Sequence, residues 1–193
     1  QIQQHGLRNE MLSIVAHGMA KGKNIDDRLE RPLSTAWQRP LRTLVLTETV
    51  EHAEAIGRNM AAWPIIVGDD ACLDGLRDIN RYQTVDRFLA GDATNLIATT
   101  AAVGRLDWER FDAVVWAGGG FDGPLPPFGK LTCPAGLDHR LLLVDVHDRH
   151  HVELRRQTAK RRHNYDARDW FPLGADDVAC RCRRYWRERE VTP

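Results

Sequence analysis

The strongest constraint on the fold is a series of short, continuous apolar runs that alternate with stretches of helical spacing between residues 41 and 148. Strands that are apolar along their whole length are buried on both faces of a sheet. Strands that alternate with helices imply a parallel sheet with right-handed crossovers. We therefore predict a three-layer α/β domain over residues 41–148. The strand candidates are 43–46, 64–67, 95–99, 113–116 and 141–146.

Helices are predicted between these strands and before them. Residues 50–60 have helical spacing, with Thr49 as a suitable N-cap and Glu51 in the first turn. Residues 82–90 form a second helix candidate. Before the domain, an amphipathic helix is predicted over residues 7–20, followed by a polar loop to residue 40. The apolar residues that indicate this first helix are Leu7, Met11, Ile14 and Met19.

A basic segment follows the domain over residues 149–193. Between residues 149 and 162 there are six Lys or Arg and one acid, Glu153, which predicts a helix with a strongly basic face. Clustered cations bind phosphate backbones by releasing counterions. The alternatives are a solvated face and a docking surface for a partner domain. The candidate phosphate contacts are Arg155, Arg156, Lys160, Arg161 and Arg162.

Composition limits the functional classes. The formal net charge is zero, so a nucleic-acid surface would be local rather than global. Four cysteines without framework spacing, and no secretory signal, favour a cytoplasmic location. No apolar run approaches the ~20 residues of a membrane span. The chain begins with Gln1, which leads us to expect a fragment of a longer polypeptide with residues 1–40 as an N-terminal helix and linker.

Specific residues within the predicted strands and helices resemble motifs of a known protein family. Residues 44–53, Leu-Val-Leu-Thr-Glu-Thr-Val-Glu-His-Ala, resemble the strand and helix that open the second RecA-like domain of superfamily 2 helicases. Residues 65–68 resemble the next short strand. Residues 95–100, Asn-Leu-Ile-Ala-Thr-Thr, resemble the threonine-ended strand of motif V, and Asp107 matches the aspartate that follows it.

The resemblance continues beyond these motifs. Arg81, Phe88 and Gly91 resemble the helix before the motif V strand, and residues 111–115 resemble the strand after it. Residues 141–148, with the basic helix that reaches Tyr165, resemble the tail of repair-type and restriction-type members. The matching order covers about two thirds of the chain.

This resemblance implies the C-terminal lobe of an ATP-dependent helicase or translocase. Such a lobe closes over ATP and magnesium held by an N-terminal RecA-like ATPase lobe, which this chain does not contain. It implies that Thr47, Thr99 and Thr100 contact a DNA or RNA strand, and that Gly104 and Asp107 face the nucleotide. The chain lacks a Gly-x-x-x-x-Gly-Lys-Ser/Thr cradle and an Asp-Glu box, so we expect no nucleotide binding or hydrolysis by this chain alone.

Two departures from the family pattern indicate a degenerate lobe. Motif V usually has glycine where this chain has Arg105, with Gly104 one place early. Motif VI usually reads Gly-Arg-x-x-Arg-Pro, whereas residues 129–134 read Gly-Lys-Leu-Thr-Cys-Pro. Lys130 and Cys133 thus replace both arginine fingers, and a lysine is only a point charge. Arg140 or Arg105 could supply charge instead; the alternative function is a degenerate module that binds nucleic acid or a protein partner.

Two other motifs have weaker functional readings. Residues 118–123 satisfy Gly-x-Gly-x-x-Gly, but the prolines at 124, 126 and 127 oppose the helix that a dinucleotide site needs, so a Gly/Pro loop is favoured over a Rossmann-type enzyme. The cluster at residues 147–151 offers three histidines and Asp148 as metal ligands. Adjacent residues at a strand end mostly diverge, so Asp148 is better read as an N-cap and we predict no metal.

Overall fold

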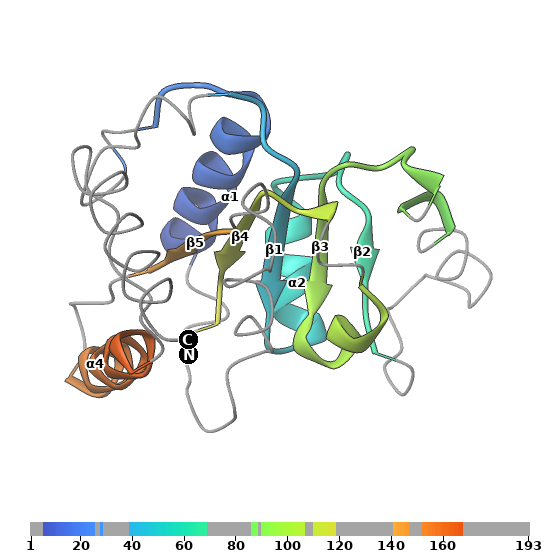
Figure 1. The fold of residues 1–193 in the computed structure, drawn as a ribbon. Coiled ribbons are helices and arrows are strands. Elements are labelled where there is room, and N and C mark those ends of the chain that lie inside the picture. Colours follow the sequence, from blue (N-terminus) through green and yellow to red (C-terminus); the bar gives the residue numbers. More distant parts are fainter. Residues whose placement is uncertain are drawn as a thin grey trace, which may run out of the picture.

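A five-stranded, all-parallel sheet lies at the centre of the protein in the computed structural model (Figure 1). The strand order is β2-β3-β1-β4-β5. The strands are β1 (Thr43–Thr47), β2 (Ile65–Ile66), β3 (Leu96–Thr99), β4 (Ala113–Trp116) and β5 (Leu142–Asp145). The structure describes residues 6–25, 28, 39–68, 86–88, 90–106, 110–118, 141–146 and 152–167. Four of the predicted strand runs contain one of these strands, and the run 43–46 falls one residue short of the end of β1. The predicted α/β fold with a parallel sheet is confirmed.

The central strand is β1, which pairs with β3 on one side and β4 on the other. In this register Leu44 lies opposite both Leu96 and Val114. All five residues of β1 are buried. Side chains alternate between the two faces of a sheet, so an apolar strand of this kind needs a covering layer on each face.

Helices α1 (Gly6–Ala20) and α2 (Val50–Gly57) cover one face (Figure 1). Their apolar side chains form one core cluster with the alternate residues of the strands beneath them, Val45, Ile97 and Val115 among them. The other face is covered by the helical residues 86–88 and by the 3-10 helix η4 (Thr100–Arg105), where Phe88 stacks on Phe111 with ring centroids 5.0 Å apart. The three layers follow from the two-sided burial of the sheet.

Helix α1 confirms the predicted helix but buries a different face from the one predicted. Of the four residues that indicated it, only Met19 is buried, whereas Leu7, Met11 and Ile14 are 74%, 36% and 43% exposed. The buried stripe is Leu12, Val15, Ala16 and Met19. Both stripes have the i, i+3/i+4, i+7 spacing of a helix face, so periodicity alone could not decide which one packs on the sheet.

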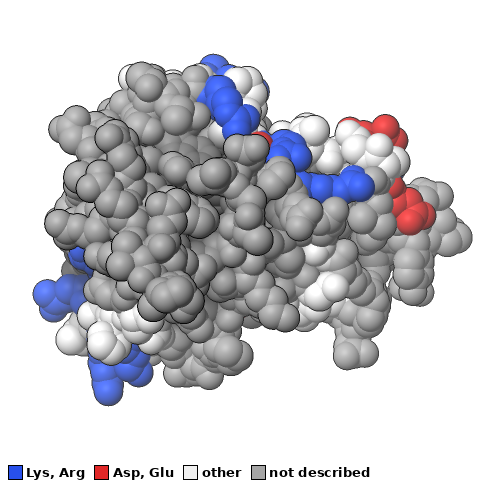
Figure 2. Space-filling model, in the orientation of Figure 1, with Lys and Arg blue, Asp and Glu red and all other residues white. Residues whose placement is uncertain are grey.

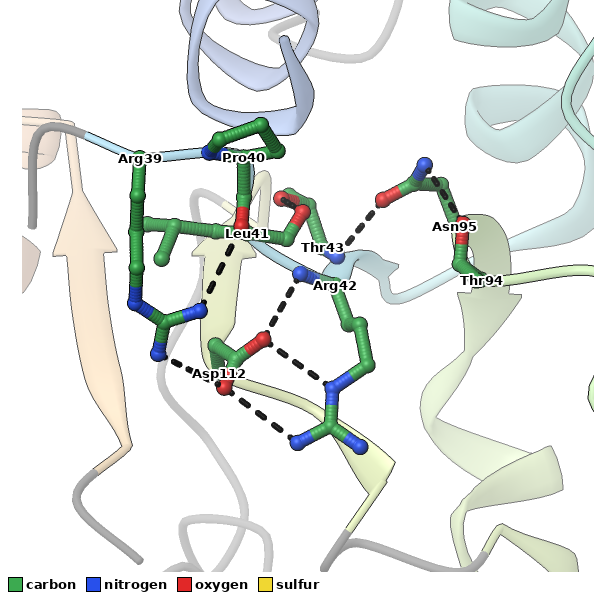
Figure 3. Close-up of polar contacts among 8 residues, drawn as sticks. All are labelled: Arg39, Pro40, Leu41, Arg42, Thr43, Thr94, Asn95 and Asp112. Atoms are coloured by element: carbon green, nitrogen blue, oxygen red, sulfur yellow. Dashed lines mark hydrogen bonds and ion pairs between the residues drawn. The ribbon is translucent and has the colours of Figure 1, made fainter. Parts of the chain in front are cut away.

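The amino-terminal edge of the sheet is fastened around Asp112, just before β4 (Figure 3). The backbone N–H and Nε of Arg42 donate to Asp112 Oδ2 at 2.9 and 3.0 Å, and the side chains of Arg42 and Arg39 donate to Oδ1 at 3.2 and 3.3 Å. Burial raises the pKa of Asp112, but the hydrogen bonds and charge of Arg42 and the charge of Arg39 outweigh it, so the pKa lies below its usual value. Asn95 Oδ1 accepts from Thr43 N–H at 2.8 Å, which fastens the start of β3 to β1.

Within the described ranges, no helix combines the length and apolar character that crossing a membrane requires.

The two apolar faces of α1 give a matched test of its packing. Leu12→Ala should lower the free energy of unfolding by about 3 kcal/mol, because it leaves a cavity against the sheet. Leu7→Ala, on the exposed face of the same helix, should change it by less than about 0.5 kcal/mol. Urea denaturation followed by circular dichroism measures both, and equal losses would contradict this orientation of α1.

Candidate functional site: the carboxyl edge of the sheet

The carboxyl ends of all five strands meet at one edge, because the sheet is wholly parallel. In open α/β sheets, ligands bind at this edge, beside the point where neighbouring strands send their connections in opposite directions. Here β1 leads through α2 to β2 on one side, while β4 leads to β5 on the other. The switch point therefore lies between the ends of β1 and β4.

Helix α1 supplies a buried arginine to this switch point. Arg8 Nη1 donates to the carbonyl of Ala117 at 2.7 Å, and Nη2 donates to that of Gly118 at 3.3 Å. A Cβ on Gly118 would lie 2.7 Å from Glu48 Oε1 and 2.8 Å from the Trp116 ring, so this position has no room for a side chain. Arg8 thus fixes the chain where it leaves β4.

The first turn of α2 is also fixed from α1. Thr49 is the N-cap, as predicted, and its hydroxyl accepts from His52 N–H at 3.3 Å. The His52 ring is fully buried and its Nε2 lies 3.1 Å from Asn9 Oδ1. Burial, with the nearby charge of Arg8, lowers the pKa of His52 to about 4. The neutral ring therefore donates from Nε2 to Asn9 at pH 7.

The threonines predicted to contact a strand lie at this edge in different settings. Thr47 is fully buried, and its hydroxyl lies 3.2 Å from the carbonyl of Thr49 and 3.3 Å from that of Ala98. The hydroxyl of Thr99 is buried without a hydrogen-bond partner among the described residues. Thr100 is partly exposed where η4 begins, and Gly104 is exposed near its end. Of the three threonines, Thr100 alone offers appreciable surface.

Several predicted cleft residues lie outside the described residues: Asp107, Lys130, Cys133 and Arg140. The backbone of Arg105 lies in η4, but its side chain is not described. Residues 119–123 of the glycine loop and the histidines at 147–151 are also outside the described part. Within that part, no group of three or more His, Cys, Asp or Glu is placed to hold a metal ion. The roles proposed for these residues stay predictions.

The basic helix predicted after the domain is α4 (Val152–Asp166), and one of its arginines anchors it to β5. Arg161 Nε donates to Asp145 Oδ2 at 2.8 Å, and its Nη2 donates to the carbonyl of Val146 at 3.1 Å. Tyr165 donates to the same carboxylate oxygen at 3.1 Å. Burial raises the pKa of Asp145, against the opposing charge of Arg161, and burial also raises that of Tyr165.

The phosphate-contact role predicted for Arg161 needs correction. Its side chain is fully buried against Asp145, so it does not share the surface of the other cations. Arg155, Arg156, Lys160 and Arg162 are all exposed, and Arg156 Nη1 lies 3.9 Å from Glu153 Oε2. In Figure 2, blue side chains gather at the lower left, where Figure 1 places α4. Four cations, not five, form the exposed basic face of α4.

Sequence reasoning missed the polar group made by Arg8, Asn9 and His52. The first two lie in a helix whose predicted apolar face was the opposite one, so they read as solvent-facing. His52 lies in a motif-like stretch, but nothing in its spacing marked it as buried. The single available signal was that polar side chains on the sheet-facing side of a helix need hydrogen-bond partners.

No protein-family model matches the chain, and no curated protein matches it. Among solved structures, the C-terminal domain of the DEAD-box protein Dbp5 has 16% identity and a TM-score of 0.45, over 64% of this chain and 70% of that chain. The C-terminal domain of S. cerevisiae Dbp5, in a complex with Gle1 and IP6, has 17% identity and a TM-score of 0.47, over 97% and 90%. The Hef helicase domain of Pyrococcus furiosus has 18% identity and a TM-score of 0.42, over 63% and 24%.

The buried His52 ring gives a pH dependence with a defined sign. Its pKa is lowered on folding, so protonation favours the unfolded chain and stability falls as pH drops from 7 towards 4. Between pH 7 and pH 5 this single group should remove about 2 kcal/mol from the free energy of unfolding. The check is urea denaturation at both values, for the wild type and for His52→Gln. The pH-dependent loss should be smaller in the variant by about that amount, and an unchanged loss would contradict the assignment.

Proposed function

We propose that this chain is the C-terminal lobe of an ATP-dependent nucleic-acid helicase or translocase and acts with an N-terminal RecA-like ATPase lobe. The observation that carries the proposal is where two elements lie relative to the sheet. The threonine-ended strand β3 and the anchored end of the basic helix α4 both lie at the carboxyl edge of one parallel sheet. That edge is where open α/β sheets bind their ligands.

The geometry supports one continuous track for a nucleic-acid strand. Strands β3 and β5 are separated in the sheet by β1 and β4, so their ends lie about 14 Å apart at the usual strand spacing of about 4.8 Å. Thr100 would contact the strand at one end of this track. The exposed cations of α4 would bind phosphates at the other end, because Arg161 holds that helix against β5.

The nucleotide side of the proposal comes from the sequence resemblance. ATP and magnesium would be held mainly by the partner lobe, with Gly104 and Asp107 facing the nucleotide and Lys130 in place of an arginine finger. A lysine cannot clamp phosphate oxygens bidentately, and arginine fingers contribute about 10³–10⁵ to the rate of phosphoryl transfer. We therefore expect slow hydrolysis even with the partner lobe present.

Binding by the basic face of α4 is tested by fluorescence anisotropy with labelled single- and double-stranded DNA and RNA over a salt series. The triple variant Arg155→Gln, Lys160→Gln, Arg162→Gln should bind more weakly, and its salt slope should fall by about 2 because up to three phosphate contacts are lost. Arg161 is left intact because it anchors the helix.

The matched control removes three cations from the opposite edge, as Lys21→Gln, Lys23→Gln and Arg58→Gln. These residues are exposed and lie near the ends of α1 and α2. The control should bind like the wild type. No binding by the wild type at low salt, or an equal loss in both triple variants, would contradict a nucleic-acid role for α4.

Hydrolysis tests the nucleotide side in the full-length protein. Asp107→Ala should abolish nucleic-acid-stimulated ATP hydrolysis, whereas Lys130→Arg should raise its rate because a guanidinium restores a bidentate clamp. Unchanged hydrolysis in Asp107→Ala would count against the cleft role of that residue.

The alternative function is a degenerate helicase-like module that binds nucleic acid or a protein partner without hydrolysing ATP. Lys130 and Cys133 at the positions of the two fingers favour it. Hydrolysis by the full-length wild type at ordinary helicase rates would exclude it.

A further inference from the structure

Helix α1 has an exposed apolar stripe as well as the stripe that packs on the sheet. Leu7, Met11 and Ile14 follow one another at i, i+4 and i+7, with 74%, 36% and 43% of their surface exposed. Single exposed apolar residues are ordinary on protein surfaces. Three in succession along one helix form the kind of seam that other helices pack against.

The stripe borders a groove between α1 and α2 with a volume of about 1620 Å³. Leu7 and Ile14 line the α1 side, and Ala55 lines the α2 side. Ser13 and Gly18 also line the groove, and both are small and buried. A Cβ on Gly18 would overlap the Ile25 side chain, so this part of the lining has no room for a larger residue. The lining therefore combines apolar and small residues with polar ones, among them Asn9, His17 and Asn59.

The two helices run in the same direction, which gives the groove two distinct ends. Asn9 and His52 join the first turns of α1 and α2. His17, late in α1, contacts the ring of Trp63, which follows α2, with centroids 5.5 Å apart. The amino-terminal ends of both helices therefore lie together, and so do their carboxyl-terminal ends.

The charges that line the groove are sorted between these ends. The amino-terminal end carries the acids Glu10, Glu51 and Glu54. The carboxyl-terminal end carries the bases Lys21, Lys23 and Arg58. Glu51 lies in the first turn of α2, where an acid favours the helix dipole. Together the two sets give the groove a negative end and a positive end.

We propose that this groove binds an amphipathic helix of a protein partner, laid antiparallel to α1 and α2. Helices tend to carry acids in their first turn and bases in their last turn. Such a helix matches both ends of the groove only in the antiparallel direction, with its basic end over Glu10, Glu51 and Glu54. Its apolar face, at i, i+3/i+4 and i+7, packs on Leu7 and Ile14. The distance from Leu7 to Lys21 along α1 is about 21 Å, so the partner helix has about 14 residues.

The groove meets the carboxyl edge of the sheet at its amino-terminal end, where Asn9 and Glu51 line it. From there it runs along α1 and α2, away from the edge that the proposed nucleic-acid track follows from η4 to α4. Partner binding is measured with a peptide and the proposed function with nucleic acid, so each can fail without the other.

The test uses the full 193-residue chain and a designed peptide of about 16 residues. The peptide has glutamates in its first turn, leucines at i, i+4, i+7 and i+11, and lysines in its last turn. A side-chain lactam keeps it helical, since free helices of this length are marginal in water. A control peptide keeps the leucines and the lactam but has glutamine in place of every glutamate and lysine outside the lactam, so it matches neither charged end in either direction.

Fluorescence anisotropy should give a Kd on the order of 10 µM for the designed peptide and at least about ten-fold weaker binding for the control peptide. The variant Leu7→Asp with Ile14→Asp should weaken binding by at least about ten-fold. Val152→Asp is the matched control in the protein, because Val152 is 68% exposed but lies on α4. Its affinity for the peptide should equal that of the wild type.

Charge reversal tests the direction of the helix. The variant Glu51→Lys with Glu54→Lys should weaken binding of the designed peptide and lessen its advantage over the control peptide. Circular dichroism and thermal denaturation confirm that each variant is folded, and these surface positions are chosen to keep it so. Equal binding of both peptides by the wild type, or binding that survives in Leu7→Asp with Ile14→Asp, overturns the proposal.

Sedimentation equilibrium without peptide distinguishes the other possible occupant. A monomer in both the wild type and Leu7→Asp with Ile14→Asp agrees with the proposal. A dimer that this variant dissociates would make the occupant a second copy of this chain and would overturn a partner helix.

Discussion

The pairing of β1 on both its edges is the constraint on which the rest of the structure depends. Its five residues are all buried, and it is hydrogen-bonded to β3 and β4 in parallel register. A strand that is apolar on both faces cannot be half-covered, so α1 and α2 must lie on one side and the Phe88 and η4 layer on the other. The parallel direction then brings every carboxyl end to one edge and determines where a site can form.

The position of the basic face of α4 depends on Arg161, which is buried and does not lie on that face. Arg161 gives up all its exposure to hold Asp145, and Tyr165 satisfies the same oxygen. Moving a charge out of water costs free energy. If either partner of a buried ion pair is removed, the other charge stays buried without compensation. This contact therefore sets the position of the helix, while its exposed cations stay on the outer surface. A flexible tail with the same charges would have no fixed position relative to the ends of the strands.

The sequence was sufficient to predict the layers, the parallel strands, the Thr49 cap and both terminal helices, because these depend on local composition and on short-range spacing. It was insufficient wherever a choice depended on a partner far along the chain. The two apolar stripes of α1 have equivalent spacing, and only packing on the sheet distinguishes them. The sequence alone therefore could not show that Leu12 is buried and Leu7 exposed. In the sequence, Arg161 cannot be told apart from the neighbouring basic residues. It is buried because the fold places Asp145 of β5 beside it. Arg8 becomes a structural residue only because the carbonyls after β4 lie within its reach.

The position of β1 in the middle of the sheet also has a consequence for synthesis on the ribosome. Thr43 meets Asn95 across 52 residues, and Arg42 meets Asp112 across 70. When β1 leaves the exit tunnel, neither of its neighbouring strands has yet been made. It then presents two apolar faces and two open edges, which are the features that promote intermolecular pairing. A nascent chain that stalls before residue 113 would keep β1 open on its β4 side and should need a chaperone at that stage.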